Sequence, residues 1–233
     1  MQIEIIVPVR PGDVDRFPVE QPNVTTRTIE CPDGNLSKLY KEAYLRSKAD
    51  IVIFKHDDLW IRNWDDFINQ VKYQLKRHMV VGIAGTRSYA PNRHPAWWMQ
   101  GAKRFGHVDG LNRGVVSHPS NGIISNKYMP VLYGEPGPAV VLDGALMAVL
   151  RTEPLMGNSD PKWAREIADC FDEAFTYHFY DIAFTLNMAR YGGCYVICSD
   201  IVHEGMGDLT DAWQKAAKMF TNKYSMGQPL MVI

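Results

Sequence analysis

Ala49–Ile61 reads ADIVIFKHDDLWI, an apolar, strand-like stretch that ends in His56 and two adjacent carboxylates, Asp57 and Asp58. A strand of this kind is normally buried on both faces, as in a parallel sheet that is covered by helices. In such sheets the residues that follow the carboxyl end of a strand lie at the edge of a crevice where ligands bind. The stretch therefore predicts an α/β fold with the acidic pair at a binding site.

Strand-like and helix-like segments alternate on both sides of this stretch, which is typical of a mostly parallel central sheet between helices. Strands are predicted at 3–9, 50–54, 79–85, 139–151 and 194–203, and helices at 36–44, 64–75, 163–168, 180–191 and 211–224. Asn35 and Asn63 are the expected N-caps of the first two helices. No internal repeat or linker interrupts this order, so one domain over residues 1–233 is expected.

Composition limits the classes of protein. With 233 residues, 46% of them hydrophobic, the chain can bury a core without disulfides, and its net charge of −1 implies no general affinity for nucleic acid or membranes. The four cysteines form neither a disulfide framework nor a CxxC pair, which favours a reducing, cytoplasmic compartment. The N-terminal MQIEIIVPVR has no basic leader and is expected to be a first strand rather than a signal peptide.

The longest apolar run, PAVVLDGALMAVL at 138–150, is interrupted by Asp143 and is shorter than the roughly 20 residues of a membrane span. No membrane association is therefore expected. The apolar C-terminal segment QPLMVI, at 228–233, could instead pack on a partner subunit, which would make the protein a homo-oligomer.

Residues 86–133 lack periodicity and are predicted to form a long irregular segment, which is more often functional than not at this length. Aromatic residues alternate there with basic ones, among them Trp97, Trp98 and Arg104. Such a mixture suits a carbohydrate acceptor and equally suits nucleic acid, through phosphate contacts and base stacking. A lid over the site, anchored by the two tryptophans, is the structural alternative.

Several polar residues stand at positions where a ligand site is expected. Asp57 and Asp58 could hold a divalent cation, although a turn with one helix-capping carboxylate is the simpler interpretation of two acids alone. His203 ends a later strand-like segment, CYVICSDIVH, and could complete a metal site with Asp58. Asp143 interrupts an apolar run, and Asp181 begins a helix as a cap or a general base.

Five short motifs occur in a fixed order: VPVR at 7–10, HDD at 56–58, LDG at 142–144, YDI at 180–182 and VHEG at 202–205. In this order the chain resembles the nucleotide-sugar glycosyltransferases of the A-type fold (GT-A), and in particular the family 2-like group named for a streptomycin biosynthesis protein. The resemblance spans Ile3 to about Tyr224. It implies a three-layer α/β/α, Rossmann-like domain.

The resemblance also implies roles for individual residues. Asp58 and His203 would hold Mn²⁺ or Mg²⁺, and Asp181 would be the catalytic base of an inverting transfer. Relatives often carry a second acid two residues after this base, where this sequence has Ala183. The donor, a UDP-sugar, would contact the following residues: Pro8, Val9, Arg10, Asp57 and Asp143. The acceptor would be a glycan or small molecule, or a hydroxymethylated DNA base.

Two other classes fit part of the pattern. His56, Asp58 and His203 have the HxD…H order of a two-histidine, one-carboxylate iron site, as in Fe(II)-dependent oxygenases. Those enzymes are β-sandwiches, whereas this sequence alternates strands with helices, and in the glycosyltransferase interpretation His56 is a structural neighbour of the metal. The other class is a nucleotide-sugar-binding module without catalytic activity.

Overall fold

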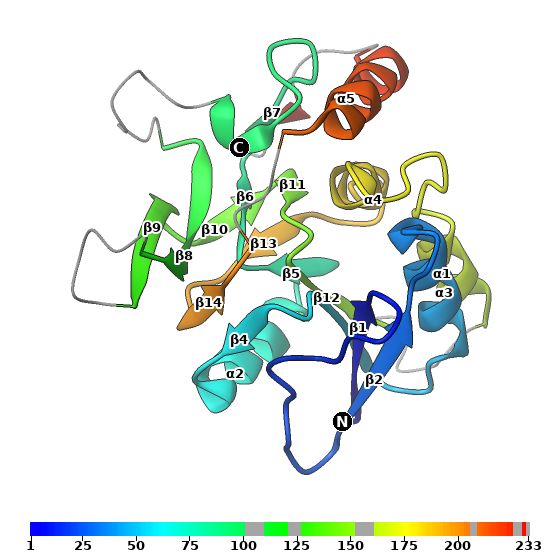
Figure 1. Ribbon diagram of the computed structural model, residues 1–233, viewed down its shortest axis with the longest axis vertical. Helices are drawn as coiled ribbons and strands as arrows, with labels where there is room; N and C mark the ends of the chain where they lie inside the picture. The colour runs from blue at the N-terminus through cyan, green and yellow to red at the C-terminus, as the bar shows by residue number, and fades with distance from the viewer. Residues whose placement is uncertain (101–109, 121–126, 152–160, 206–208, 226–229, 232–233) are drawn as a thin grey trace.

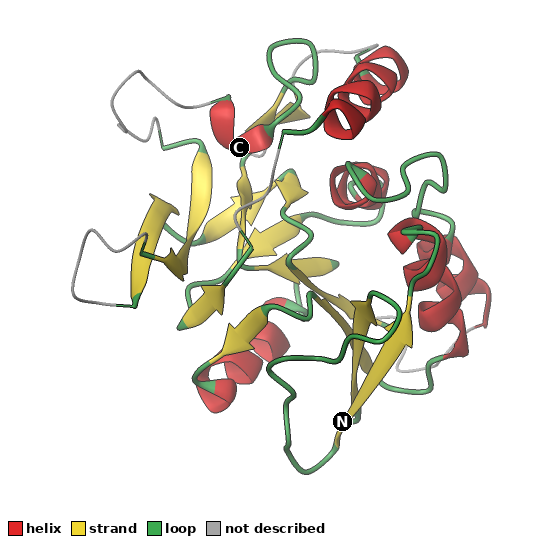
Figure 2. Cartoon of the chain, viewed as in Figure 1, coloured by secondary structure: helices red, strands yellow, loops and turns green. Residues whose placement is uncertain are grey.

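The computed structural model describes residues 1–100, 110–120, 127–151, 161–205, 209–225 and 230–231 (Figures 1 and 2). Its largest sheet has seven strands in the order β10-β13-β5-β12-β3-β1-β2. In that order the strands are β10 (Gly137–Ala139), β13 (Cys194–Val196), β5 (Val80–Gly82), β12 (Leu146–Leu150), β3 (Ile51–Lys55), β1 (Ile3–Val9) and β2 (Val24–Glu30).

This sheet is mixed, so the expected mostly parallel sheet is not confirmed. β2, β1 and β3 are parallel neighbours, as are β13 and β5, whereas β12 is antiparallel to both of its neighbours and β10 is antiparallel to β13. The apolar segment 139–151, predicted as one strand, is interrupted by a turn at Gly144 and Ala145, and its second half becomes β12. Apolar character marks a buried strand but does not encode its direction.

Helices cover both faces of the sheet. α1 (Leu36–Arg46), α3 (Pro161–Ala168) and α4 (Tyr180–Met188) pack with Ile6, Val52 and Phe54 in one core cluster. On the opposite face, Ile5 and Ile53 share a second cluster with α2 (Trp64–Gln74) and α5 (Asp211–Tyr224). The helices therefore lie in layers on either side of the strands (Figure 1), which is the α/β arrangement expected from the sequence.

The two helix starts predicted from asparagine are confirmed. The Asn35 side chain accepts a hydrogen bond of 3.0 Å from the Lys38 amide, and Asn63 accepts one of 3.1 Å from the Asp66 amide. The caps therefore set the first residues of α1 and α2, Leu36 and Trp64. No helix in the described ranges is at once long and apolar enough to cross a bilayer.

A second sheet has the order β11-β6-β8-β14-β4, and β9 pairs with β8 outside that path. Its strands are β11 (Val141–Leu142), β6 (Ala84–Thr86), β8 (Asn112–Pro119), β14 (Ile201–His203), β4 (Leu59–Ile61) and β9 (Tyr128–Gly134). A small antiparallel pair joins β7 (Ser88–Tyr89) to β15 (Leu230–Met231), and a short 3₁₀ helix, η1, spans Trp97–Met99.

This second sheet corrects three sequence predictions. The strands predicted at 79–85 and 194–203 each divide in two, and their halves lie in different sheets. The segment 86–133 is not irregular throughout, because it contains the antiparallel pair β8 and β9. Its strand signal is weak because Gly114 is required by packing: φ is +105°, and a Cβ there would collide with the Ile83 carbonyl oxygen.

Candidate metal and donor site

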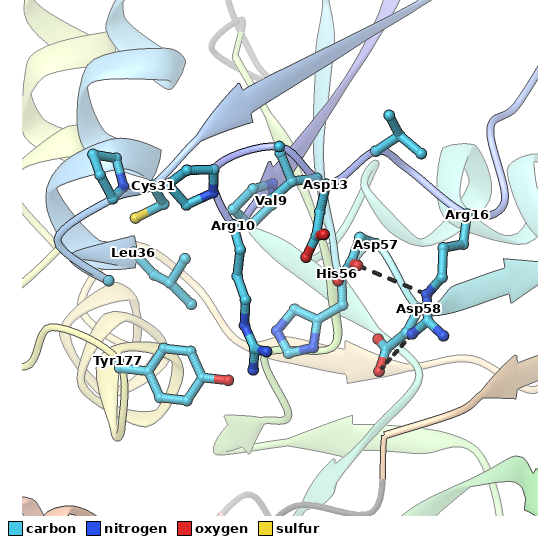
Figure 3. Close-up of a pocket in the computed structure, with 16 residues that line it drawn as sticks. Val9, Arg10, Asp13, Arg16, Cys31, Leu36, His56, Asp57, Asp58 and Tyr177 are labelled. Carbon is cyan, nitrogen blue, oxygen red and sulfur yellow. Dashed lines mark ion pairs between the residues drawn. The ribbon is translucent and has the colours of Figure 1, made fainter.

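A cavity of about 850 Å³ lies at the carboxyl ends of the three parallel strands β1, β2 and β3 (Figure 3). This is the edge at which open α/β sheets bind ligands, and the volume is within the range of small-molecule sites. Arg10 extends across the cavity toward His56 and Tyr177. The lining residues include four of the five predicted donor contacts, Pro8, Val9, Arg10 and Asp57, and the predicted metal ligand Asp58.

His203 reaches this site from a distant part of the sequence through strand pairing. β14 runs antiparallel to β4, with His203 opposite Leu59, and the Glu204 amide donates a 3.0 Å hydrogen bond to the Asp58 carbonyl. As a result, His203 Nε2 lies 3.2 Å from Asp58 Oδ1. The structure therefore brings together the two residues predicted as metal ligands.

The potential metal-ligand set contains one further residue, His56. One donor atom from each of His56, Asp58 and His203 lies within 4.8 Å of the others, and divalent transition metals accept this donor set. One observation fits a bound cation. The backbone passes close to the ligand atoms, since a Cβ on Gly205 would lie 2.7 Å from Asp58 Oδ2 and 3.1 Å from His203 Nε2.

Protonation in the cluster follows from burial and neighbouring charge. Burial opposes ionisation of Asp58, but His203, His56 and Arg16 outweigh it and lower the Asp58 pKa to about 2. Burial, with the charge of His203, lowers the pKa of His56 to about 4. The pKa of His203 is raised, because its interaction with Asp58 outweighs its burial. Asp58 and His56 therefore favour the forms that bind a metal, a carboxylate and a neutral imidazole, whereas a metal would have to displace a proton from His203.

Arg16, in the loop between β1 and β2, is the counter-ion of the acidic residues at this site. Its guanidinium lies 2.8 Å from Glu204, 3.5 Å from Asp58 and 3.8 Å from Asp57. Glu204 also accepts a 2.8 Å hydrogen bond from the Tyr128 hydroxyl. Because the Arg16 side chain is 47% exposed and lines the cavity, it can reorient when another cation binds.

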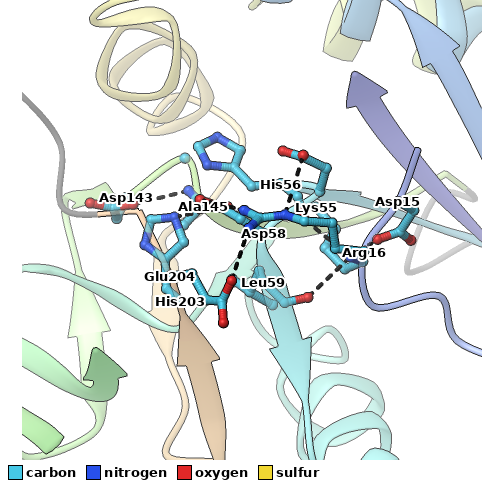
Figure 4. A network of polar contacts seen from close by, with 12 residues as sticks. Asp15, Arg16, Lys55, His56, Asp58, Leu59, Asp143, Ala145, His203 and Glu204 are labelled. Atoms are coloured by element: carbon cyan, nitrogen blue, oxygen red, sulfur yellow. Dashed lines mark hydrogen bonds and ion pairs between the residues drawn. The ribbon is translucent and has the colours of Figure 1, made fainter. Parts of the chain in front are cut away.

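A buried ion pair anchors the turn that carries the cluster (Figure 4). Lys55 Nζ lies 2.8 Å from Asp15 Oδ1 and donates to the carbonyls of His56, at 3.0 Å, and Leu59, at 3.1 Å. The two side chains are only 0% and 4% exposed. Burial lowers the Lys55 pKa, and Asp15 opposes that shift. Lys55 therefore fixes the turn that carries Asp57 and Asp58 to the loop that carries Arg16.

The predicted base, Asp181, lies at the start of α4 beside Asp143. Its Oδ2 accepts a 2.7 Å hydrogen bond from the Gly144 amide, and its Oδ1 accepts one of 2.8 Å from the Ile182 amide. Burial and then the charge of Asp143 raise the Asp181 pKa to about 7. Asp143 is not among the described residues that line the cavity, although its charge also acts on His56 and His203.

The predicted acceptor or lid residues have different environments. Trp97, in η1, is 1% exposed and packs edge-on against Trp98 and at a tilt against Tyr133. Trp98 is 37% exposed. Trp97 is therefore a core anchor, and Trp98 presents an aromatic surface to solvent. Arg104 lies outside the described residues.

Arg16 and Lys55 were not predicted from the sequence as site residues, and His56 was predicted only as a structural neighbour of the metal. Arg16 belongs to a loop without a motif, and Lys55 reads as an ordinary end of a strand. A usable signal was present for Lys55, because a lysine directly after four apolar strand residues is expensive to bury without a carboxylate partner. His118, at the end of β8, was also missed, and its ring centroid lies 5.7 Å from that of His203.

No protein-family model matches this sequence, and no curated protein sequence matches it. Among solved structures, the chain is similar to A197 from STIV, with 11% identity over 86% of this chain and 83% of that chain and a TM-score of 0.38. It is also similar to a CMP:2-keto-3-deoxy-manno-octonic acid synthetase complexed with CTP, with 10% identity over 96% of this chain and 100% of that chain and a TM-score of 0.38. A third similar structure is S. aureus TarS 1-349, with 13% identity over 95% of this chain and 66% of that chain and a TM-score of 0.42. These similarities are weak and carry no conclusion about activity.

Proposed function

We propose that this protein is a metal-dependent glycosyltransferase that moves a sugar from a nucleotide-diphosphate donor, a UDP-sugar, to an acceptor hydroxyl. The observation that carries the proposal is the position of the His56, Asp58 and His203 cluster beside an 850 Å³ cavity at the carboxyl ends of β1, β2 and β3. Nucleotides bind in pockets at this edge of an α/β sheet, and a divalent cation held by carboxylates commonly binds their phosphates.

The cavity wall provides the groups that a nucleotide diphosphate requires. Pro8 and Val9 form the apolar part beside β1, where the base would lie, and Asp57 would accept hydrogen bonds from the nucleotide. Asp58 and His203 would hold Mn²⁺ or Mg²⁺, whose charge stabilises a departing diphosphate. The Arg16 and Arg10 guanidinium groups are available to the phosphate oxygens, which they can bind in a bidentate manner.

Asp181 is the proposed general base of an inverting transfer. With a pKa of about 7, it would be substantially ionised at neutral pH while remaining basic enough to accept the proton of the incoming hydroxyl. Asp143 contributes by raising this pKa through its charge, and it would contact donor-sugar or acceptor hydroxyls. The acceptor would pack on the Trp98 side and would be a glycan or small molecule, or a hydroxymethylated DNA base extruded from the helix.

The experiment that tests this proposal is a thermal-shift panel of nucleoside diphosphates with and without Mn²⁺. We expect a rise in melting temperature for UDP that requires the metal, since a ligand that binds the native state stabilises it. Asp58→Asn should abolish this metal-dependent shift. Asp65→Asn, which removes an exposed acid in the first turn of α2, should leave the shift unchanged. A panel in which no nucleotide shifts the wild-type protein would contradict the proposal.

The same cluster gives a second candidate. His56, Asp58 and His203 converge as a two-histidine, one-carboxylate set, which is the donor set of non-haem iron oxygenases. The helices on both faces of the sheet disfavour this class, because those oxygenases are β-sandwiches. Anaerobic addition of Fe²⁺ and 2-oxoglutarate separates the two functions, since only an oxygenase would then convert 2-oxoglutarate to succinate and CO₂ when air is admitted.

A further inference from the structure

The hydroxyl group of Tyr180 connects the metal cluster to the Gly144 peptide. It lies 3.0 Å from His56 Nε2 and donates a 3.1 Å hydrogen bond to the Gly144 carbonyl. The Tyr180 side chain is buried, and its ring packs 5.6 Å from that of Tyr40. This contact is therefore made inside the core, where a polar group needs a partner and geometry is well fixed.

The direction of these hydrogen bonds determines the tautomer of His56. A carbonyl oxygen can only accept, and among the described residues the Tyr180 hydroxyl is the donor to Gly144. The single hydroxyl hydrogen is thus used, and the Tyr180 oxygen must accept from His56 Nε2–H. In a neutral imidazole the other nitrogen, Nδ1, then carries the free lone pair. An imidazole binds a metal only in this neutral form, with its lone pair on the nitrogen that faces the metal.

We propose that His56 binds the metal through Nδ1 as a third protein ligand, and that Tyr180 is the residue that positions it. The inference rests on the metal of the proposed function but does not depend on the donor or the acceptor. Metal-bound histidines generally donate their second ring N–H to a carbonyl, a carboxylate or water, which fixes the ring and the tautomer. Tyr180 fills that place, with the Gly144 carbonyl behind it.

The start of α4 is built to hold this arrangement. Phe179 precedes the helix with φ of +65°, a left-handed conformation that is uncommon for a side chain of this size, and Tyr180 and Asp181 follow it. Both contact the Gly144 peptide, Tyr180 at its carbonyl and Asp181 at its amide. A Cβ on Gly144 would collide with the Tyr180 hydroxyl and lie 2.8 Å from Asp181 Cβ. Only glycine permits this approach.

A third ligand of this type has a consequence for metal choice. Two imidazoles and one carboxylate favour transition metals such as Mn²⁺, Fe²⁺ or Co²⁺, whereas Mg²⁺ prefers oxygen ligands. Removing the His56 contribution should therefore weaken Mn²⁺ binding more than Mg²⁺ binding. A site made only of Asp58 and His203 would show no such change.

The test is a Mn²⁺ titration of the nucleotide-free protein, followed by electron paramagnetic resonance, for wild type, Tyr180→Phe and Tyr44→Phe. Tyr180→Phe keeps the packed ring and should weaken Mn²⁺ binding about 10- to 100-fold, the usual effect of removing a residue that orients a metal ligand. Tyr44→Phe is the matched control, because Tyr44 is also buried and its hydroxyl donates to a carbonyl, that of Leu150, at 3.2 Å. It should leave Mn²⁺ affinity unchanged.

His56→Gln provides a second measurement, which remains informative if Tyr180→Phe folds poorly. It should lower the ratio of Mn²⁺ to Mg²⁺ affinity along with the Mn²⁺ affinity itself. Mn²⁺ affinities within twofold of wild type for either folded variant would overturn the inference, as would a wild-type protein that binds no divalent metal. Normal metal results without any nucleotide-dependent thermal shift would instead refute only the proposed glycosyl transfer.

Discussion

Replacing Lys55 with methionine should be among the most damaging single substitutions in this protein. Methionine has a similar length and would fill the same space, so the change removes the charge with little loss of packing. The Asp15 carboxylate would be left buried without a counter-ion, and the carbonyls of His56 and Leu59 would each lose a donor. Removing one partner of a buried ion pair costs about 3–5 kcal/mol of folding free energy.

In a chain of 233 residues, each kcal/mol shifts the melting temperature by roughly 2–4 °C, so this loss corresponds to about 6–20 °C. Urea denaturation followed by circular dichroism measures the free energy directly. Lys41→Met is the control: Lys41 pairs with two carboxylates, Asp169 at 3.2 Å and Glu173 at 3.1 Å, but these lie on the surface. Pairs of that kind contribute at most about 1 kcal/mol.

A second substitution separates the ion pair from the turn it anchors. In Lys55→Met/Asp15→Leu no unpaired charge remains, so much of the lost stability should return, whereas the His56 and Leu59 carbonyls still lack their donor. We therefore expect weakened Mn²⁺ binding in both variants and restored stability only in the double one. A loss below about 1 kcal/mol for Lys55→Met would refute the assignment of Lys55 as a buried charge that depends on Asp15.

Two further predictions concern charge at the site. Transfer activity should rise with pH through about 7 as Asp181 ionises, and it should be lost in Asp181→Asn. Because the pKa of Asp181 is raised in the folded state, protonated Asp181 stabilises the fold below about pH 4, and this stabilisation is lost as pH rises through about 7. Asp181→Asn should therefore make the free energy of unfolding less dependent on pH between these values. A pH–rate profile and urea curves between these values check both. Arg16→Gln should tighten Mn²⁺ binding without nucleotide about 2- to 5-fold by removing a competing cation, as measured by calorimetry. Arg62→Gln, which removes an ion pair with Asp200, should not. An unchanged or weaker affinity in Arg16→Gln would contradict the counter-ion role.

The parts of the fold that the sequence determined are those governed by local periodicity. The strands around Ile5 and Ile53 and the helices capped by Asn35 and Asn63 lie where predicted. Alternating apolar residues and capping side chains act within a few residues of each other, so one sequence contains the whole signal. The buried strand that contains Ile53 also predicted the position of the candidate site at the end of β3, because the residues after a buried strand emerge at the edge of its sheet.

The antiparallel direction of β12 and the division of 194–203 between two sheets depend on contacts between segments far apart in the chain. Gly114 illustrates the same limit: it weakens a strand signal locally but is required because the Ile83 carbonyl approaches it. In both cases the deciding interaction joins residues whose proximity no local pattern encodes.

The candidate site divides in the same way. Sequence alone selected Asp58, His203 and Asp181 as residues suited to a metal and a base, since their types and their places after strands or before a helix are local properties. Only the tertiary structure decided that β14 pairs with β4 in the register that sets His203 opposite Leu59, and that Arg16 is the counter-ion of the cluster. The contact between His56 and the Tyr180 hydroxyl likewise joins residues 124 positions apart in the sequence. Hydrogen bonds and ion pairs depend on distance in space, and distance in space is set by how the sheets pair.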